Sequence, residues 1–330
     1  MRLRFEIPPG PPPPERAPDR KSGRLDALIA ERAGITRSQA KKLIEMGKVL
    51  IDGRPPSKAG GRPKAGEVVE VDIPGPESGR LLPEPIELDV RYIDDYLAVV
   101  DKPAGMVVYP AAGHAGGTLL NALLYRTGGK HAGVGAPLRP GVVHRLDKDT
   151  TGLMVIALED KTYYGLLEQL KSRSIRREYA ALVWGGLRQD EGVISARIGR
   201  SRTDRKKMST RTRHGKEAIT SWRVVERFHQ AASLVHARLG TGRTHQIRVH
   251  FASVGHPVLG DRTYGRKTRL ELGGRIFPVP RQMLHARLLG FTHPVTGEKL
   301  EFESPLPQDM AEILGKLRDF HGEREERSGG

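Results

Sequence analysis

Residues 141–158 read GVVHRLDKDTTGLMVIAL and place a polar, turn-forming segment between two apolar runs. Short apolar runs bounded by turn residues are typical of buried strands, so we expect a loop between two strands here. Two interpretations of this loop stay open on the residues alone. In the first, Asp147 is a working acid in a loop where functional side chains cluster. In the second, a carboxylate bonds the backbone at Thr150 or Thr151 in an Asx-type turn, and Arg145 merely neutralises it.

The composition narrows the chemistry and the class of partner. With no cysteine, the chain has no thiolate nucleophile, no thiolate metal site and no disulfide. Its 55 lysines and arginines exceed its 39 aspartates and glutamates by 16, and its pI is about 10.1. Such an excess favours a polyanionic partner, with nucleic acid as the first candidate and a membrane surface as the second. No apolar stretch approaches the ~20 residues of a spanning helix, so we expect a soluble, cytoplasmic protein.

The two ends of the chain differ in composition from the rest. Residues 1–22 include the run PPGPPPP and lack the apolar core of a secretory signal. Because proline favours polyproline II over helix or sheet, we expect an extended, disordered arm over residues 1–22. Residues 321–330 carry no apolar side chain, and we expect a disordered tail there. The remainder predicts a small domain over residues 23–75 and a larger one over residues 76–320.

Residues 24–74 are typical of a compact unit in which two helices precede a hairpin. Apolar residues recur at helical spacing from Leu25, and a second helix should end at Gly47. The outward basic residues form either a phosphate-facing surface or a solvated face. These residues are Arg24, Arg37, Lys41, Lys42, Lys48 and Arg54.

This unit resembles the small RNA-binding domain named after a small-subunit ribosomal protein. The match rests on RLD at 24–26, TRSQA at 36–40, IEMGKV at 44–49 and IDG at 51–53. In that family the helix pair grips structured RNA. The resemblance therefore implies an RNA partner and not an activity.

The larger domain alternates apolar, strand-like runs with helices. Thr118 is expected to cap a leucine-rich helix, and a second helix should cover residues 160–170. Pro103 should break the run over residues 97–108 into two strands. Because strands outnumber helices and many loops are short, we predict an α+β fold with a mixed, mostly antiparallel sheet. Further strands are expected over residues 176–184, 221–227, 233–239 and 299–303.

A strongly basic segment lies in this domain. Residues 196–213 hold eight basic side chains against one acidic, and they include Arg205, Lys206 and Lys207. Such a segment repels itself unless a polyanion is present, so we expect it to contact RNA. The alternative is a solvated loop without a partner.

Residues 241–250 read TGRTHQIRVH and form a second dense motif. A zinc site is a weak interpretation, because the two histidines are five residues apart and no carboxylate lies close in sequence. Arg243 and Arg248 are better explained as partners for a carboxylate or a phosphate.

Together these motifs resemble the RluA-like family of pseudouridine synthases, over roughly residues 24–310. The sequence departs from the family motifs at two places. Thr151 stands where serine is common, and Tyr109-Pro110 stands where His-Pro is often found. Neither changes the carboxylate at position 147. The matched motifs are VVDKPAG at 99–105, VHRLDKDTTGL at 143–153, REYAALVWG at 177–185, TGRTHQIRVH at 241–250, and LHA at 284–286 with FTHP at 291–294.

The resemblance implies an isomerase that needs no cofactor or metal. In this family the bond between the glycosidic nitrogen of uracil and the ribose breaks, the base turns, and it rejoins through ring carbon five. Asp147 is then the catalytic carboxylate, and whether it attacks the sugar or removes a sugar proton stays open. Arg248 keeps it ionised, and Tyr179 lies against the base and is a candidate to move the proton. Since the uridine must leave the RNA stack, Arg145 is expected to fill the gap.

The same resemblance implies the partner. Structured RNA of the large ribosomal subunit is the first choice and transfer RNA the second, bound by a monomer. The competing hypothesis is a non-catalytic RNA-binding factor in assembly or regulation, which has no need of the three catalytic residues. The remaining RNA-binding candidates, besides the basic residues named above, are His144, Thr150, Arg243 and His245.

Overall fold

The computed structural model divides the chain into two compact units, Met1–Gly79 and Arg80–Gly330. The boundary lies close to the one predicted between residues 75 and 76. Within the described residues, no helix combines the length and the apolar character needed to cross a membrane. The structure describes residues 2–8, 23–33, 35, 37–56, 58, 60–72, 81–111, 114–135, 138–204, 207–212 and 214–328.

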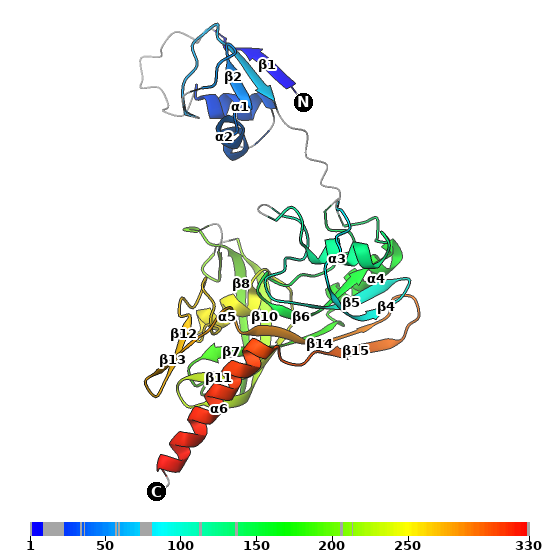
Figure 1. The fold of residues 1–330 in the computed structure, drawn as a ribbon, viewed down its shortest axis with the longest axis vertical. Coiled ribbons are helices and arrows are strands. Elements are labelled where there is room, and N and C mark those ends of the chain that lie inside the picture. The colour runs from blue at the N-terminus through cyan, green and yellow to red at the C-terminus, as the bar shows by residue number, and fades with distance from the viewer. Residues whose placement is uncertain are drawn as a thin grey trace. The chain divides into compact units, whose positions relative to one another are not determined.

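The N-terminal unit combines two helices with a three-stranded antiparallel sheet (Figure 1). The helices are α1 (Leu25–Ala33) and α2 (Arg37–Glu45), as the spacing of apolar residues predicts. The strands lie in the order β1 (Arg2–Glu6), β3 (Val68–Asp72) and β2 (Val49–Ile51). Apolar side chains from both helices and all three strands share one core.

Strand β1 shows that the expected disordered arm was wrong at its start. All five of its residues pair with β3. Leu3 and Phe5 pack against the core of the unit, and Ile7 is buried in it. Because side chains alternate across a strand, this short pattern creates one apolar face, which the following proline run obscured. Residues 9–22, the rest of the expected arm, lie outside the described residues.

The larger unit is built on one ten-stranded sheet (Figure 1). The mixed, mostly antiparallel sheet is confirmed, because every neighbouring pair in it is antiparallel except β6 and β14. The order is β4-β5-β6-β14-β7-β11-β10-β8-β9, with β15 on the side of β14. The strands are β4 (Asp89–Ile93), β5 (Leu97–Lys102), β6 (Thr151–Ala157), β7 (Arg176–Trp184), β8 (Glu191–Arg200), β9 (Met208–Ser209), β10 (Lys216–Phe228), β11 (Ala232–Leu239), β14 (Leu284–Thr292) and β15 (Lys299–Glu303).

Two of the helices begin where the sequence predicts. Thr118 caps α3 (Leu119–Arg126) in a capping box with Asn121, and α4 covers Asp160–Lys171. Two more helices were not foreseen, α5 (Gln246–Ser253) and α6 (Gln308–Ser328), nor was the hairpin of β12 (Arg269–Leu272) and β13 (Arg275–Pro278).

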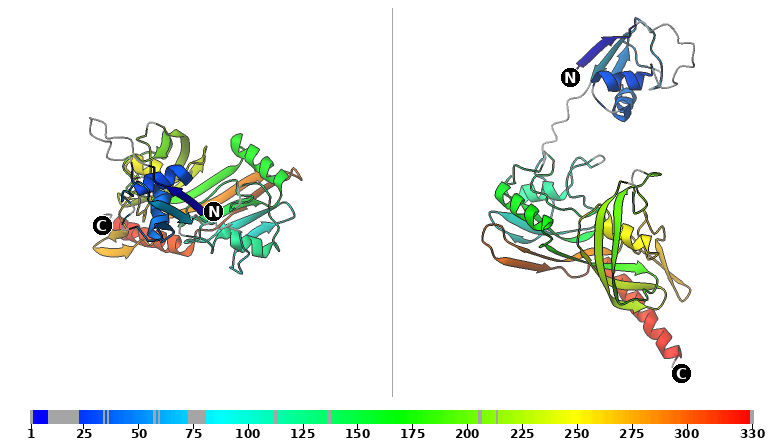
Figure 2. Two further views of the ribbon diagram at one scale, coloured as in Figure 1. Left: turned by 90° about the horizontal axis from the view of Figure 1, so that it is seen from above. Right: turned by 180° about the vertical axis from the view of Figure 1, so that it is seen from behind.

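Two expectations about this unit were wrong. Residues 321–328 continue helix α6 instead of forming a disordered tail. The right-hand view of Figure 2 shows this helix from behind, where it again extends beyond the sheet. Residues 329–330 lie outside the described residues. The predicted second strand after Pro103 is a loop, in which Gly105 has a φ of 81° that an extended strand does not accommodate.

The two faces of β7 pack against different partners. Tyr179 and Ala181 belong to a core that includes Ile247 and Phe251 of α5. The alternate residues belong to a second core with the buried face of α6. Because side chains alternate across a strand, Tyr179 lies on the α5 face of the sheet. That face carries the candidate site.

Candidate active site

Asp147 lies in a turn that is closed by its main-chain carbonyl and not by its carboxylate. The amide of Thr150 donates to the main-chain carbonyl of Asp147 at 3.1 Å. The carboxylate Oδ2 instead accepts from Nη1 of Arg248 at 2.7 Å. Arg145 donates to the hydroxyl of Tyr109 at 2.8 Å, and its guanidinium lies 5.5 Å from the centre of that ring. The Asx-turn interpretation, with Arg145 as the neutralising charge, was therefore wrong.

Arg248 joins two carboxylates from inside the protein. It lies on α5 with 5% of its surface exposed. Its Nε and Nη2 donate to the two oxygens of Asp261 at 2.7 and 2.9 Å, and its third nitrogen reaches Asp147. Burial opposes the charge, but the hydrogen bonds that Arg248 donates to Asp261 and the attraction of Asp147 outweigh it and raise the pKa of Arg248. The guanidinium stays charged and holds a fixed orientation.

Asp261 is a residue of this network that the sequence analysis missed. Its side chain is fully buried, and its Oδ1 also accepts from the amides of Thr263 at 2.8 Å and Tyr264 at 3.1 Å. No pattern in the sequence singled out Asp261, although a constrained glycine precedes it. Gly260 has a φ of 73°, and a Cβ there would lie 2.0 Å from the carbonyl oxygen of Arg281. The backbone there admits no side chain, which accounts for the glycine but gives no hint of the partner of Asp261.

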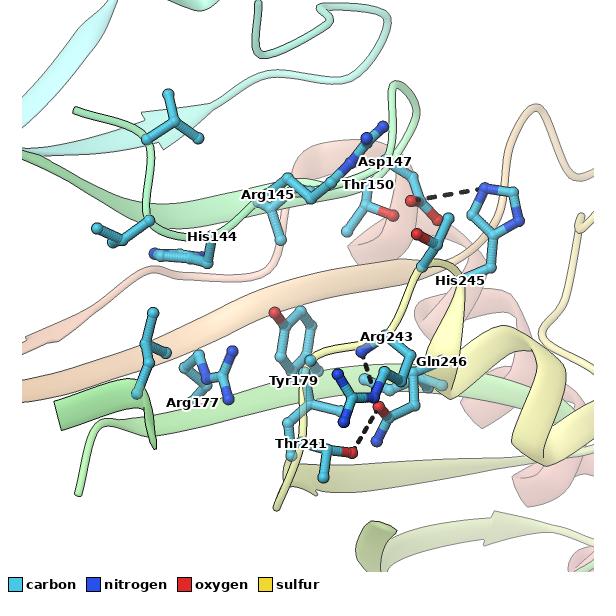
Figure 3. A pocket seen from close by; sticks show the side chains of 18 of the residues that line it. His144, Arg145, Asp147, Thr150, Arg177, Tyr179, Thr241, Arg243, His245 and Gln246 are labelled. Carbon is cyan, nitrogen blue, oxygen red and sulfur yellow. Dashed lines mark hydrogen bonds and ion pairs between the residues drawn. The ribbon is translucent and has the colours of Figure 1, made fainter. Parts of the chain in front are cut away.

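His245 approaches the other oxygen of the same carboxylate. Its Nε2 lies 3.7 Å from Oδ1 of Asp147, and its Nδ1 lies 2.7 Å from the hydroxyl of Tyr264 (Figure 3). Burial lowers the pKa of His245, although Asp147 opposes the shift, so the ring is neutral. The hydroxyl of Tyr264 also accepts a hydrogen bond from the amide of Met208 at 3.0 Å. The Tyr264 proton can then point at Nδ1, which leaves the Nε2 proton facing Asp147.

The buried side chain of Lys102 holds the loop that carries Asp147. Its side chain is fully buried, and Nζ donates to the carbonyls of Pro103, Met106 and Lys148 at 2.8, 2.9 and 2.9 Å. Burial lowers the pKa of Lys102 to about 7, against the attraction of the nearby carboxylates of Asp149 and Asp147. The contact with Lys148 ties the end of β5 to the loop that carries Asp147. The sequence motif contained this lysine but gave it no role.

Asp147, His245 and Arg248 line one cleft of about 550 Å³ (Figure 3). Tyr179 lies in it with 5% of its surface exposed, and burial raises the pKa of its phenol, so the ring is neutral. Thr150 is buried and accepts a hydrogen bond from Gln282 at 3.2 Å. Arg243 is half-buried, and its Nε donates to the carbonyl of Glu217 at 3.0 Å. The structure thus brings together the predicted Asp147, Tyr179, Arg248, His144, Arg145, Thr150, Arg243 and His245.

The other predicted RNA contacts are distributed over the surface of both units. Most of those in the N-terminal unit have an acidic partner: Arg24 and Arg37 both contact the buried Asp26, Lys41 contacts Glu45, and Lys48 contacts Asp72. The exposed pairs of Lys41 and Lys48 contribute little to stability and are free to exchange for phosphate. Lys42 is exposed, and Lys207 lies 3.9 Å from Asp204. Arg205 and Lys206 lie outside the described residues.

Comparison with known proteins agrees with this fold and site. Residues 96–253 match the RNA pseudouridylate synthase family, and residues 23–69 match the S4 domain. An uncharacterized RNA pseudouridine synthase of Bacillus subtilis is 44% identical over 301 residues, which cover 91% of this chain and 96% of that protein. The ribosomal large subunit pseudouridine synthase D of Zymomonas mobilis is 42% identical over 300 residues, covering 89% and 93%.

A solved structure agrees as well. The human RNA pseudouridylate synthase domain containing 4 superimposes with a TM-score of 0.53 at 27% identity, over 70% of this chain and 93% of that one. The fold and the cleft thus define an isomerase that acts on RNA. The chain belongs to the RNA pseudouridine synthase family and carries an S4 domain at its N-terminus. The family expected from the sequence motifs is confirmed.

Proposed function

We propose that this protein isomerises specific uridines of large-subunit ribosomal RNA to pseudouridine, with Asp147 as the catalytic carboxylate. Relatives named for the large ribosomal subunit support the choice of RNA. The net charge of +16 and the S4 domain support a structured polyanion as substrate. The observation that carries the role of Asp147 is its contact with Arg248, which Asp261 holds from the opposite side.

The reaction needs an ionised carboxylate close to the ribose. The bond between N1 of uracil and C1′ breaks, and its electron pair leaves with the base. The base then turns, C5 bonds to C1′, and C5 loses its proton. Asp147 either attacks the sugar or removes a sugar proton, and in both routes it acts as a carboxylate oriented by the hydrogen bond from Arg248. Tyr179 offers an aromatic face to the base and a neutral phenol to the proton transfer.

The uridine must leave its stack before it reaches this carboxylate. Arg145 is exposed at the mouth of the cleft, where it rests on Tyr109. An exposed hydrogen bond of this kind is weak enough to exchange. We assign Arg145 to the gap that the extruded base leaves.

The test is direct chemical mapping of pseudouridine. Purified protein is incubated with transcribed large-subunit ribosomal RNA, and with small-subunit ribosomal RNA and transfer RNA in parallel, and each reaction is repeated with Asp147→Asn. We expect product at defined uridines of the large-subunit RNA from the unaltered protein alone. Product confined to transfer RNA would overturn the assigned substrate. Equal product from both proteins would overturn the role of Asp147.

A further inference from the structure

Arg177 is a buried cation without a partner in the described part of the chain. It lies on β7 with 7% of its surface exposed, and its Nε is buried without a hydrogen bond. The other buried arginines of this unit, Arg248 and Arg281, each form a two-bonded pair with a carboxylate. Burial lowers the pKa of Arg177. An unpaired guanidinium at such a position destabilises the free protein, which is typical of a group kept for a ligand.

A second unpartnered donor lies beside it. His144 accepts a hydrogen bond from the amide of Val155 at its Nε2, at 3.2 Å. Burial, together with the charge of Arg177, lowers the pKa of His144 to about 3, so the ring is neutral. With Nε2 as acceptor, the ring proton must sit on Nδ1. That Nδ1 is buried without a hydrogen-bond partner among the described residues.

Both donors line the same cleft as the catalytic carboxylate. In Figure 3, Arg177 and His144 lie on one side of the Tyr179 ring, and Asp147 lies on the other. The charges of Arg177 and of Asp147 both act on Tyr179. If the sugar is at Asp147 and the base against Tyr179, the far edge of the base points at the two unpartnered donors.

We propose that Arg177 and His144 hold a carbonyl oxygen of the flipped uracil, and that Arg177 stabilises the negative charge on the base after the N1–C1′ bond breaks. This inference rests on the proposed function. The electron pair of that bond leaves with the base, and the charge spreads from N1 onto the two carbonyl oxygens and C5. A desolvated guanidinium interacts strongly with such a charge and needs no rearrangement at the moment of reaction. The same donors select a base that presents an acceptor there.

A backbone phosphate is the other acceptor that RNA offers. Phosphates follow the sugar, which the proposed function places at Asp147 and not behind Tyr179. The exposed Arg145 and the half-buried Arg243 of the same cleft are better placed for the strand outside it. The burial of Arg177 therefore favours the base over the backbone.

The first experiment compares Arg177→Met with Arg176→Met. Arg176 is the preceding residue on the same strand and contacts the exposed Glu301 at 2.9 Å, so it is a matched control. The substrate is a synthetic stem-loop carrying the uridine that the unaltered protein modifies. We expect Arg177→Met to lower kcat about 100-fold with the RNA Kd within about threefold, because losing one preorganised donor has that effect. Arg176→Met should retain kcat, and Arg177→Lys should recover part of the loss.

Thermal unfolding separates this role from a structural one. Removal of an unpartnered buried charge should leave the Tm of Arg177→Met equal to or above that of the unaltered protein. A lowered Tm with unchanged kcat would overturn the proposal. Failure of the unaltered protein to form pseudouridine on any RNA would refute the proposed function, whereas full activity of Arg177→Met would refute this inference alone.

The second experiment identifies the contacted atom. Stem-loops carry 2-thiouridine, 4-thiouridine, or a neutral methylphosphonate beside the target, because sulfur accepts hydrogen bonds more weakly than oxygen. We expect one of the thio substrates to slow the unaltered protein but to have little further effect on Arg177→Met. If only the methylphosphonate shows this loss of additivity, or if none does, Arg177 does not hold the base.

Discussion

The substitution Asp261→Asn tests whether Asp261 anchors the arginine that contacts the catalytic loop. Oδ1 of Asp261 accepts three hydrogen bonds, from Nη2 of Arg248 and from the amides of Thr263 and Tyr264, whereas Oδ2 accepts one, from Nε of Arg248. An asparagine keeps its oxygen at the position with three donors. Its amide group then faces Nε–H of Arg248, donor against donor.

The size of the effect follows from these contacts. Removing one partner of a buried ion pair costs roughly 3–5 kcal/mol. Three of the four hydrogen bonds survive, and Asp147 still offsets the charge of Arg248. We therefore expect Asp261→Asn to lower the free energy of unfolding by about 3 kcal/mol, at the low end of that range.

Tryptophan fluorescence makes this measurement specific. Both tryptophans of the chain, Trp184 and Trp222, lie in the larger unit, so their emission during a urea titration reports the unfolding of that unit alone. The control is Asp190→Asn, whose carboxylate is 88% exposed and pairs with Arg227. An exposed pair contributes less than about 1 kcal/mol. If Asp261→Asn costs no more than this control, Asp261 does not anchor Arg248.

Three further predictions concern the cleft. Arg145→Ala should lower turnover at least about tenfold on folded RNA, because the stack stays unfilled; an equal loss on an unstructured oligonucleotide would count against that role. Tyr179→Phe keeps the aromatic face, so the RNA Kd should stay within about threefold while turnover falls about 100-fold; unchanged turnover would remove Tyr179 from the proton transfer. Burial lowers the pKa of His144 from the ordinary histidine value of 6.5 to about 3 in the folded protein. The unfolded chain therefore takes up this proton first as the pH falls below 6.5, and stability is lost progressively down to about pH 3. At pH 5 this amounts to about 2 kcal/mol, which His144→Gln should lack; urea titrations with parallel pH dependence in both proteins would contradict it.

The sequence predicted best those features that depend on neighbours in the chain. Thr118 caps its helix as expected, and β7 spans the residues assigned to a strand. Asp147 and Arg248 lie 2.7 Å apart although they are 101 positions apart in sequence. That pair was foreseen only because each belongs to a recognisable family motif.

The contacts that were missed join distant segments whose motifs gave no hint of a partner. Lys102 reaches the carbonyl of Lys148 across 46 positions, and Asp261 reaches Arg248 from the loop that follows α5. Conversely, Arg145 is two residues from Asp147, and one of the two interpretations of the loop paired their charges. The structure instead directs the Arg145 side chain to Tyr109.

The central claim is that the carboxylate of Asp147 performs the chemistry, and single-turnover pseudouridine formation on one large-subunit RNA transcript tests it most directly. Asp149, two residues further along the same loop, is the matched control. We expect Asp147→Asn to lower the rate at least about 1,000-fold while RNA binding is retained, and Asp149→Asn to stay within about threefold of the unaltered protein. A rate for Asp147→Asn equal to that of Asp149→Asn would contradict the account.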